Sequence, residues 1–224
     1  AARHAISNLA ILDEAATGLG NINFSAEIDG LIRRVPIFTQ YIREGEIPDY
    51  SDPFALPPLY PTIGAEAIRI AQGARAFRVR MSDASGEGGL SGTSGIAGVS
   101  IGAFPLVTDA NGHVWLHYTG FQPDRYLPAW RLLSDDEPIG PADRLEGAIV
   151  LVGTSAPGLF DLRSTPLNAI LPGVEVHAEL IEQILTDSFL TRPDWTLGAE
   201  LASFALLGLI LIFLLPHLGA AGGA

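Results

Sequence analysis

The chain has 224 residues and a formal net charge of -12, from 25 acidic and 13 basic residues, which is long enough for one sizeable domain with an appendage. Phosphate binding needs clustered cations, so this balance argues against a nucleic-acid partner. Every basic residue is Arg and there is no Cys, which excludes a Walker-type phosphate loop, Schiff-base chemistry, disulfides, thiol nucleophiles and zinc–cysteine sites.

The first third of the chain is predicted to contain two helices and two short strands. Residues 5–16 are modestly apolar and are expected to be helical. Residues 20–38, GNINFSAEIDGLIRRVPIF, predict two short strands joined by a turn at Asp29-Gly30. After a Pro- and Tyr-rich segment that we expect to be an irregular loop, residues 62–72 carry apolar side chains at helical spacing, and Gly73 is expected to end that helix.

The middle of the chain is predicted to be rich in strands. Residues 77–81 have the composition of a strand, and the Gly- and Ser-dense segment 82–98 is expected to be a mobile loop of unknown role. Two apolar runs, 99–107 and 113–118, flank Asn111-Gly112, which is a strong signal for a β-hairpin.

The next part of the sequence follows the pattern of strand, glycine loop and helix. A short helix is expected over residues 127–133. Residues 148–152, AIVLV, carry no polar side chain and predict a central strand covered on both faces. Residues 174–186 have apolar side chains at helical spacing, with Glu175 and Glu179 early in the helix, where its dipole favours them. We therefore predict an α/β fold, with a mixed sheet and helices packed on it.

The C-terminal segment is predicted to be a transmembrane helix. From Trp195 to Leu215 the only ionisable residue is Glu200, and about 20 mostly apolar residues suffice to cross a bilayer. Trp195 suits the membrane interface, and Arg192 can snorkel toward the headgroups. The expected organisation is a folded domain over residues 1–194, a transmembrane helix over 195–218 and a short tail over 219–224.

The main candidate site is the loop at residues 151–167, LVGTSAPGLFDLRSTPL. Its polar side chains include Thr154, Ser155, Asp161 and Arg163. Ser155, Asp161 and His177 follow the chain order of an α/β-hydrolase triad. However, Pro157 replaces the second Gly of the nucleophile elbow, and the three residues lie within 23 positions, which is too tight for that fold.

Two further interpretations of this loop remain open. Backbone N–H groups together with Arg163 would suit an anionic or other polar ligand. Alternatively, Asp161 and Arg163 pair with each other and with nearby backbone, and so fix a strand-to-helix crossover; this structural interpretation is favoured. His113 and His117 lie roughly 13 Å apart if they flank a strand, so chelation of a metal by this pair is not expected. No other metal site and no cofactor are predicted.

Three segments in order resemble a known family. They are INFSAEIDGLIRRVPIF, AIVLVGTSAPGLFDLRSTPL and PGVEVHAELIEQILTDSFLTRPDW, and over residues 20–195 they resemble the CHASE domain of the second type. The residues that match the family pattern are Asp29, Gly30, Arg33, Arg34, Pro36, Gly153, Thr154, Ala156, Pro157, Gly158, Asp161, Arg163, Thr165, Pro166, Pro172, Gly173, Val174, His177 and Ala178.

The resemblance implies a non-enzymatic sensory input domain of a bacterial transmembrane receptor. It places the main domain on the periplasmic side of the cytoplasmic membrane, with an output domain that is a nucleotide cyclase, histidine kinase, diguanylate cyclase or protein kinase. Expected partners are the membrane, a second copy in a homodimer, and a small molecule or an envelope protein, but no nucleic acid. Thr154, Ser155, Asp161 and Arg163 are the candidate ligand residues.

The resemblance also leaves some points open. The other motif residues, among them Asp29, Gly30, Arg33, Arg34, Gly153, Pro166 and His177, are expected to be structural. Such proteins usually begin with a membrane helix and a strand–helix–strand unit, so this sequence is expected to be a fragment that lacks the front. Two alternative functions are a membrane-anchored extracytoplasmic hydrolase that uses Ser155 and His177, and a binding or assembly module of the envelope.

Overall fold

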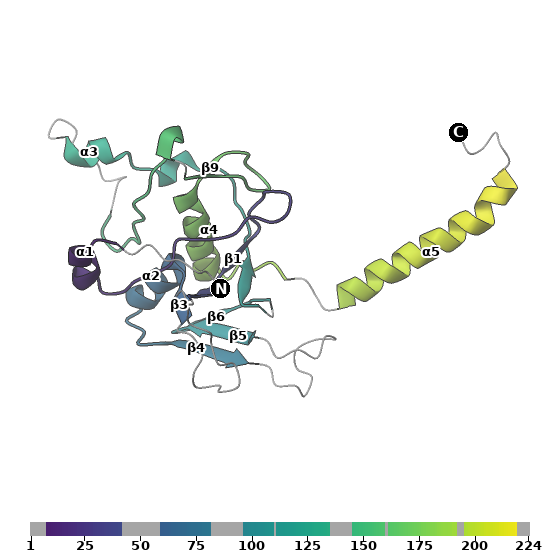
Figure 1. The fold of residues 1–224 in the computed structure, drawn as a ribbon, viewed down its shortest axis with the longest axis horizontal. Helices are drawn as coiled ribbons and strands as arrows, with labels where there is room; N and C mark the ends of the chain where they lie inside the picture. The colour runs from purple at the N-terminus through teal and green to yellow at the C-terminus, as the bar shows by residue number, and fades with distance from the viewer. Residues whose placement is uncertain are drawn as a thin grey trace.

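The protein is described by a computed structural model, which shows a body of short strands and helices with one long helix extending from it (Figure 1). The described residues are 8–41, 59–81, 96–109, 111–134, 145–159, 161–191 and 195–218. The predicted loop at 82–98 lies outside them up to residue 95, as does most of the Pro- and Tyr-rich segment.

The elements follow one another along the chain in a mixed order. The helices are α1 (Ala10–Ala15), α2 (Ile63–Ala71), α3 (Ala129–Leu133), α4 (Gly173–Thr186) and α5 (Trp195–Leu218), with 3-10 turns η1 (Pro123–Arg125) and η3 (Pro157–Leu159). The strands are β1 (Arg34–Pro36), β2 (Phe38–Gln40), β3 (Leu59–Pro61), β4 (Phe77–Met81), β5 (Ile96–Ile101), β6 (Phe104–Leu106), β7 (His113–Trp115), β8 (Leu162–Arg163) and β9 (Leu171–Pro172). The helices predicted at 62–72 and 174–186 and the strand at 77–81 are confirmed.

The described strands form four small antiparallel sheets rather than one mixed sheet. Strands β4, β5 and β6 make a three-stranded sheet, and the pairs β1–β7, β2–β3 and β8–β9 make two-stranded ones. Within the described ranges the one parallel contact outside these sheets is an isolated bridge between Asn21 and Thr62. The α/β class is therefore confirmed, but the predicted single mixed sheet is not.

Both predicted hairpins form their turns but not their strand pairs. Gly112 adopts a φ of +78° and its N–H donates to the Asp109 carbonyl at 2.9 Å, yet β7 pairs with β1 and not with β6. The reason is burial, because the β1–β7 register places Val35 opposite Val114 and both are fully buried. The turn at Gly30 likewise forms, but the residues before it are in no named strand.

The prediction of a buried central strand at residues 148–152 was wrong. The structure has no strand there, and alternate side chains point in opposite directions. Ile149 and Leu151 pack against the core, whereas Val150 is 52% exposed and Val152 is 94% exposed. The segment keeps the two-residue alternation of an extended chain, and only one of its faces is covered.

Helix α4 lies at the centre of the hydrophobic core. Its apolar face, with Val176, Leu180 and Ile184, is buried and packs on α2. The two helices approach closely because α2 carries Gly64 at the contact; a Cβ there would lie 3.3 Å from Leu180 Cδ2. Asp187 ends α4 in the left-handed conformation, with a φ of 54°.

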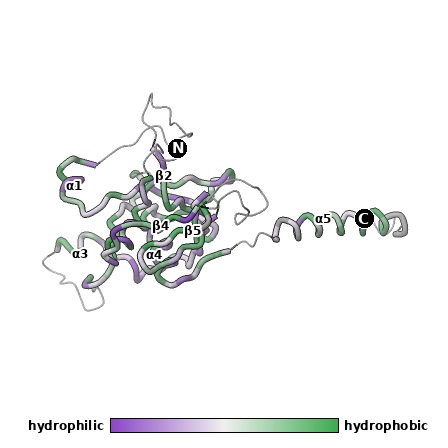
Figure 2. The backbone as a smooth tube through the Cα atoms, turned by 90° about the horizontal axis from the view of Figure 1, so that it is seen from below, coloured by the Kyte–Doolittle hydropathy of each residue, from purple (hydrophilic) through white to green (hydrophobic). Residues whose placement is uncertain are grey.

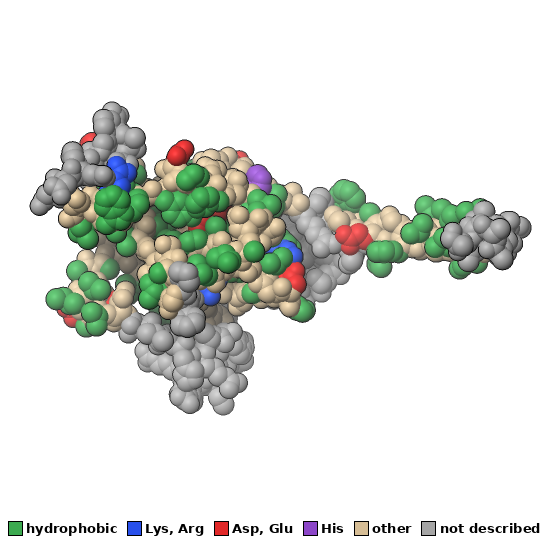
Figure 3. Space-filling view, turned by 90° about the horizontal axis from the view of Figure 1, so that it is seen from above, with side chains coloured by type: hydrophobic (Ala, Val, Ile, Leu, Met, Phe, Trp, Pro, Cys, Tyr) green, Lys and Arg blue, Asp and Glu red, His purple; other side chains and the backbone are tan. Residues whose placement is uncertain are grey.

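Helix α5 leaves the body and extends away from it in both views (Figures 1 and 2). Its large apolar side chains are exposed from Leu201 to Leu214, and Figure 3 shows hydrophobic side chains along it. Taken over the described residues, no helix combines the length and the apolar character required to cross a membrane.

The core position on α4 gives a direct test of this packing. Leu180→Ala should lower the free energy of unfolding by about 2–5 kcal/mol, because it leaves a cavity at a side chain that is fully buried. Leu185→Ala on the same helix is the matched control and should cost less than about 1 kcal/mol, since Leu185 is 49% exposed. Urea denaturation of the full chain in detergent micelles measures both; equal losses would contradict the placement of α4.

Candidate functional site

The Asp-Gly and Arg-Arg motif forms ion pairs beside the turn at Gly30. The guanidinium of Arg33 donates two hydrogen bonds to the Asp29 carboxylate, at 2.9 and 2.6 Å. These bonds are the main reason that the pKa of Asp29 falls to about 2. The Leu31 N–H also donates to this carboxylate, at 3.1 Å, so Asp29 organises the turn from its own side chain.

Arg34 joins the turn before β1 to the distant segment 109–115. Its Nε donates to Glu27 at 2.7 Å and its NH1 to Asp109 at 3.2 Å. Its guanidinium also lies 4.9 Å from the centroid of the Trp115 ring, on the strand paired with β1. The guanidinium groups of Arg33 and Arg34 are therefore both engaged in ion pairs within the domain.

The candidate loop at residues 151–167 is pressed against the start of α4. A Cβ on Gly153 would lie 2.5 Å from the Cβ of Val174, so only glycine permits this approach. The Gly173 N–H donates to the Asp161 carbonyl at 2.7 Å, and a Cβ on Gly173 would overlap the Asp161 carboxylate. That carboxylate thus lies at the N-terminus of α4, where the helix dipole favours a negative charge.

Arg163 and His177 meet around the ring of Phe24. Arg163 NH2 lies 3.4 Å from the Asp161 carboxylate, and the guanidinium is 5.6 Å from the Phe24 centroid. The ring of His177 packs on the same phenyl group at 5.3 Å, and its Nε2 is 3.3 Å from the Ile22 carbonyl oxygen. Burial lowers the pKa of His177, so the ring is neutral at physiological pH.

The loop does not present the geometry of a hydrolase. Thr154 and Ser155 are exposed, and no hydrogen bond among the described residues joins Ser155 to His177. Farther along the loop, Thr165 is buried and its hydroxyl closes a turn with Asn168, while Pro166 is exposed. The structure brings Asp161, Arg163 and His177 together and leaves Thr154 and Ser155 at the surface.

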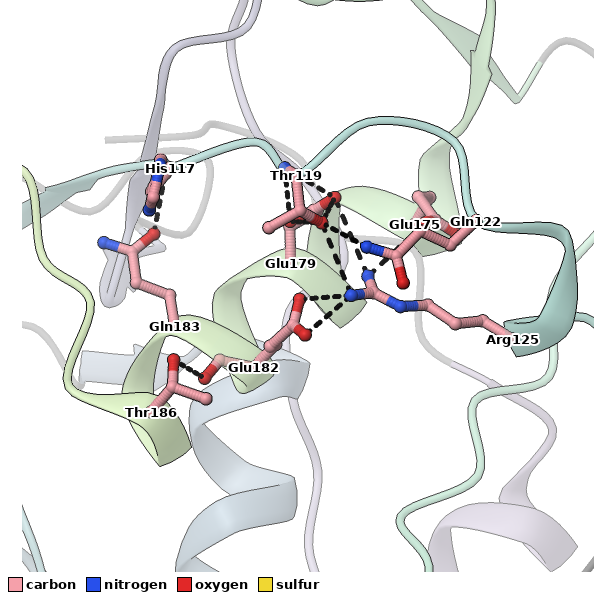
Figure 4. A network of polar contacts seen from close by, with 9 residues as sticks. All are labelled: His117, Thr119, Gln122, Arg125, Glu175, Glu179, Glu182, Gln183 and Thr186. Carbon is pink, nitrogen blue, oxygen red and sulfur yellow. Dashed lines mark hydrogen bonds and ion pairs between the residues drawn. The ribbon is translucent and has the colours of Figure 1, made fainter.

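A second polar cluster lies on the opposite, polar side of α4 and was not predicted (Figure 4). Arg125 reaches from η1 to three α4 carboxylates, at 2.6 Å from Glu182, 3.8 Å from Glu179 and 4.0 Å from Glu175. The Thr119 N–H and hydroxyl also donate to the Glu179 carboxylate, at 3.1–3.3 Å.

Gln183 extends this cluster along the backbone of β7 and the segment after it. Its side-chain oxygen accepts from the His117 N–H at 2.8 Å, and its amide donates to the Trp115 carbonyl at 2.8 Å. Gln183 is almost completely buried, so α4 replaces a neighbouring strand as the partner of this backbone.

Comparison with known families now identifies the chain. The CHASE2 domain family matches residues 2–215. The chain belongs to the CHASE2 domain family. CHASE2 domains are extracytoplasmic sensory domains. No curated protein and no solved structure matches this CHASE2 chain, and the described residues hold no cluster of three His, Cys, Asp or Glu side chains that suits a metal ion.

The glutamates of the second cluster follow a pattern that is visible in the sequence. Glu175, Glu179 and Glu182 occur at i, i+4 and i+7, so they lie on one face of α4. From the sequence, Glu175 and Glu179 were expected only to interact favourably with the helix dipole. Arg125 comes from a part of the chain about 50 residues earlier, and no local pattern connects it to them.

The glycine contact at the candidate loop leads to a second prediction. Gly153→Ala should destabilise the body by about 1–3 kcal/mol, because the new methyl group must displace Val174 or the loop. Gly158→Ala, in the same loop, is the control: a Cβ there meets no atom within 4 Å. Thermal denaturation of both variants decides the point, and equal melting temperatures would show that the loop is not pressed against α4.

Proposed function

We propose that this chain is the sensory input domain of a bacterial transmembrane receptor, held at the cytoplasmic membrane by α5 with its body on the periplasmic side. The observation that carries the proposal is the succession of α4 and α5. The most buried helix of a CHASE2 sensory domain ends at Thr186, and an apolar helix that the body does not cover begins at Trp195. The cytoplasmic output domain is then a cyclase or a kinase.

No helix among the described residues has the length and apolar character of a membrane span, so the support for the proposal is the exposed apolar surface of α5. Its 24 residues extend about 36 Å at 1.5 Å per residue. Exposed leucine, isoleucine and phenylalanine side chains from Leu201 to Leu214 would leave water on insertion. Glu200 then lies near the membrane interface, where a carboxylate costs less than at the bilayer centre.

Signalling in such a receptor requires two states with different affinities for the stimulus. A hundredfold preference for one state corresponds to about 2.7 kcal/mol, which is enough to change the populations of two packed arrangements. The stimulus is a small molecule or an envelope protein that contacts the loop carrying Thr154, Ser155, Asp161 and Arg163. A homodimer through the receptor lets the two α5 helices move against each other.

Membrane insertion of α5 is tested with two charges at its centre. Leu209→Arg combined with Ile212→Arg should release the chain from membranes, because each buried arginine costs about 2.5–3.5 kcal/mol on insertion. The control replaces the same two residues by Ala. The readout is the fraction of chain that resists alkaline carbonate extraction; a native chain that carbonate extracts fully would contradict the span.

The side of the membrane on which the body lies is tested by cysteine labelling, since the chain has no Cys of its own. A single Asp124→Cys substitution on the exposed surface of η1 should react with an impermeant maleimide in intact spheroplasts. Labelling only after lysis would place the body in the cytoplasm and overturn the periplasmic assignment.

A ligand role for the loop is tested separately at Arg163. The side chain is 42% exposed, so Arg163→Ala should change the stability of the body by less than about 1 kcal/mol while altering the response of the full-length receptor. Arg75→Ala, at another exposed arginine, is the control and should leave the response unchanged. If Arg163→Ala unfolds the body, the structural interpretation of the loop is correct.

A further inference from the structure

The cluster around Arg125 contains more negative than positive charge. Among the described residues, Arg125 is the one guanidinium with an ion pair to Glu175, Glu179 or Glu182. Its closest contact, at 2.6 Å, is with Glu182, which is the most exposed of the three at 37%. Glu175 and Glu179, the two inner carboxylates, lie farther from the guanidinium, at 4.0 and 3.8 Å, and so interact with it more weakly.

The inner carboxylates are also the ones that water does not reach. The side chains of Glu179 and Glu175 are 2% and 5% exposed. Within the described part of the chain, the Oε1 atom of Glu175 has the Arg125 guanidinium at 4.0 Å and lies beside the buried hydroxyl of Tyr126. An ionised carboxylate in a dry site is costly, and for Glu179 uptake of a proton would remove that cost.

The groups that face Glu179 act on its pKa in both directions, and burial has the largest effect. Burial raises the pKa of Glu179, and Glu182 adds to the rise, against the opposing effect of the bonds from Thr119 and the charge of Arg125. Burial likewise raises the pKa of both nearby tyrosines, so they remain neutral. The titratable and charged side chains around Glu179 are Tyr118, Arg125, Tyr126, Glu175 and Glu182.

We propose that segment 119–126 closes on α4 with uptake of a proton at Glu179, so that mild acidification tightens the closed arrangement. In an open arrangement the Glu179 carboxyl is hydrated and titrates at its ordinary pKa. The closed arrangement holds the proton more strongly, so the extra stability is complete below the ordinary pKa and is lost as the pH rises through the raised one.

This inference concerns the body alone and does not depend on the location of α5. Ionised Glu179 keeps its bonds to Thr119, but it must do so in a dry site beside two other carboxylates. At neutral pH the population of the open arrangement therefore rises, because in that arrangement the Glu179 carboxylate is hydrated. The segment that opens carries Arg125, the cation that joins η1 to α4.

Amide hydrogen exchange of the full chain in detergent micelles tests the proposal at pH 5.5 and 7.5, after correction for the intrinsic pH dependence of exchange. Protection over residues 119–126 should be about threefold or more higher at pH 5.5, since each unit of pKa difference between the two arrangements contributes up to about tenfold. Glu179→Gln, which keeps an acceptor oxygen and carries no charge, should give the same protection at both pH values. Asp124→Asn, an exposed acid of η1, should retain the native pH dependence.

Each alternative outcome overturns the proposal. Native protection that is equal or lower at pH 5.5 excludes tightening by a proton. A pH dependence that persists in Glu179→Gln assigns the effect to another group. Should that variant fail to fold, the side-chain ¹³C resonance of Glu179 in the native chain decides, and titration at or below the ordinary value of about 4.3 excludes the proton uptake.

Discussion

The burial of α4 is the constraint on which the rest of the structure depends. Its apolar face packs on α2 through the gap that Gly64 leaves, and its N-terminus is held by the loop that Gly153 brings close. Its polar face is buried as well, and there Gln183 and Glu179 accept hydrogen bonds from the backbone after β7. Helix α4 contacts two of the small antiparallel sheets, through β6 and β9.

The motif residues of the CHASE2 family mostly set this geometry. Arg34 connects the turn before β1 to the turn before β7, and Asp29 orders its own turn through Arg33. Gly153 and Gly173 allow the loop and the helix to approach. Thr154 and Ser155, in the same loop, are exposed.

Local features of the sequence predicted where helices and strands form better than they predicted which elements contact each other. Helices α2 and α4 and strand β4 follow from side-chain periodicity and composition, which act within a few residues. Strand pairing depends on contacts between distant segments, so the turn at Asn111-Gly112 was predicted correctly while the pairing of β7 with β1 was not. In the candidate site, Asp161 and Arg163 were predicted to pair, and the structure places them 3.4 Å apart. Arg125 was missed because its glutamate partners lie on a helix far along the chain.

The two faces of α4 differ in how easily they can change. Shifting the apolar face opens a cavity in the core, and such cavities cost several kcal/mol each. The polar face is held by a few bonds from Thr119 and Arg125, and its three carboxylates share one cation. A rearrangement there exchanges one set of polar contacts for another or for water, at a smaller cost. Helix α4 is followed in the chain by α5, so its polar face belongs to the element that precedes the helix leaving the body.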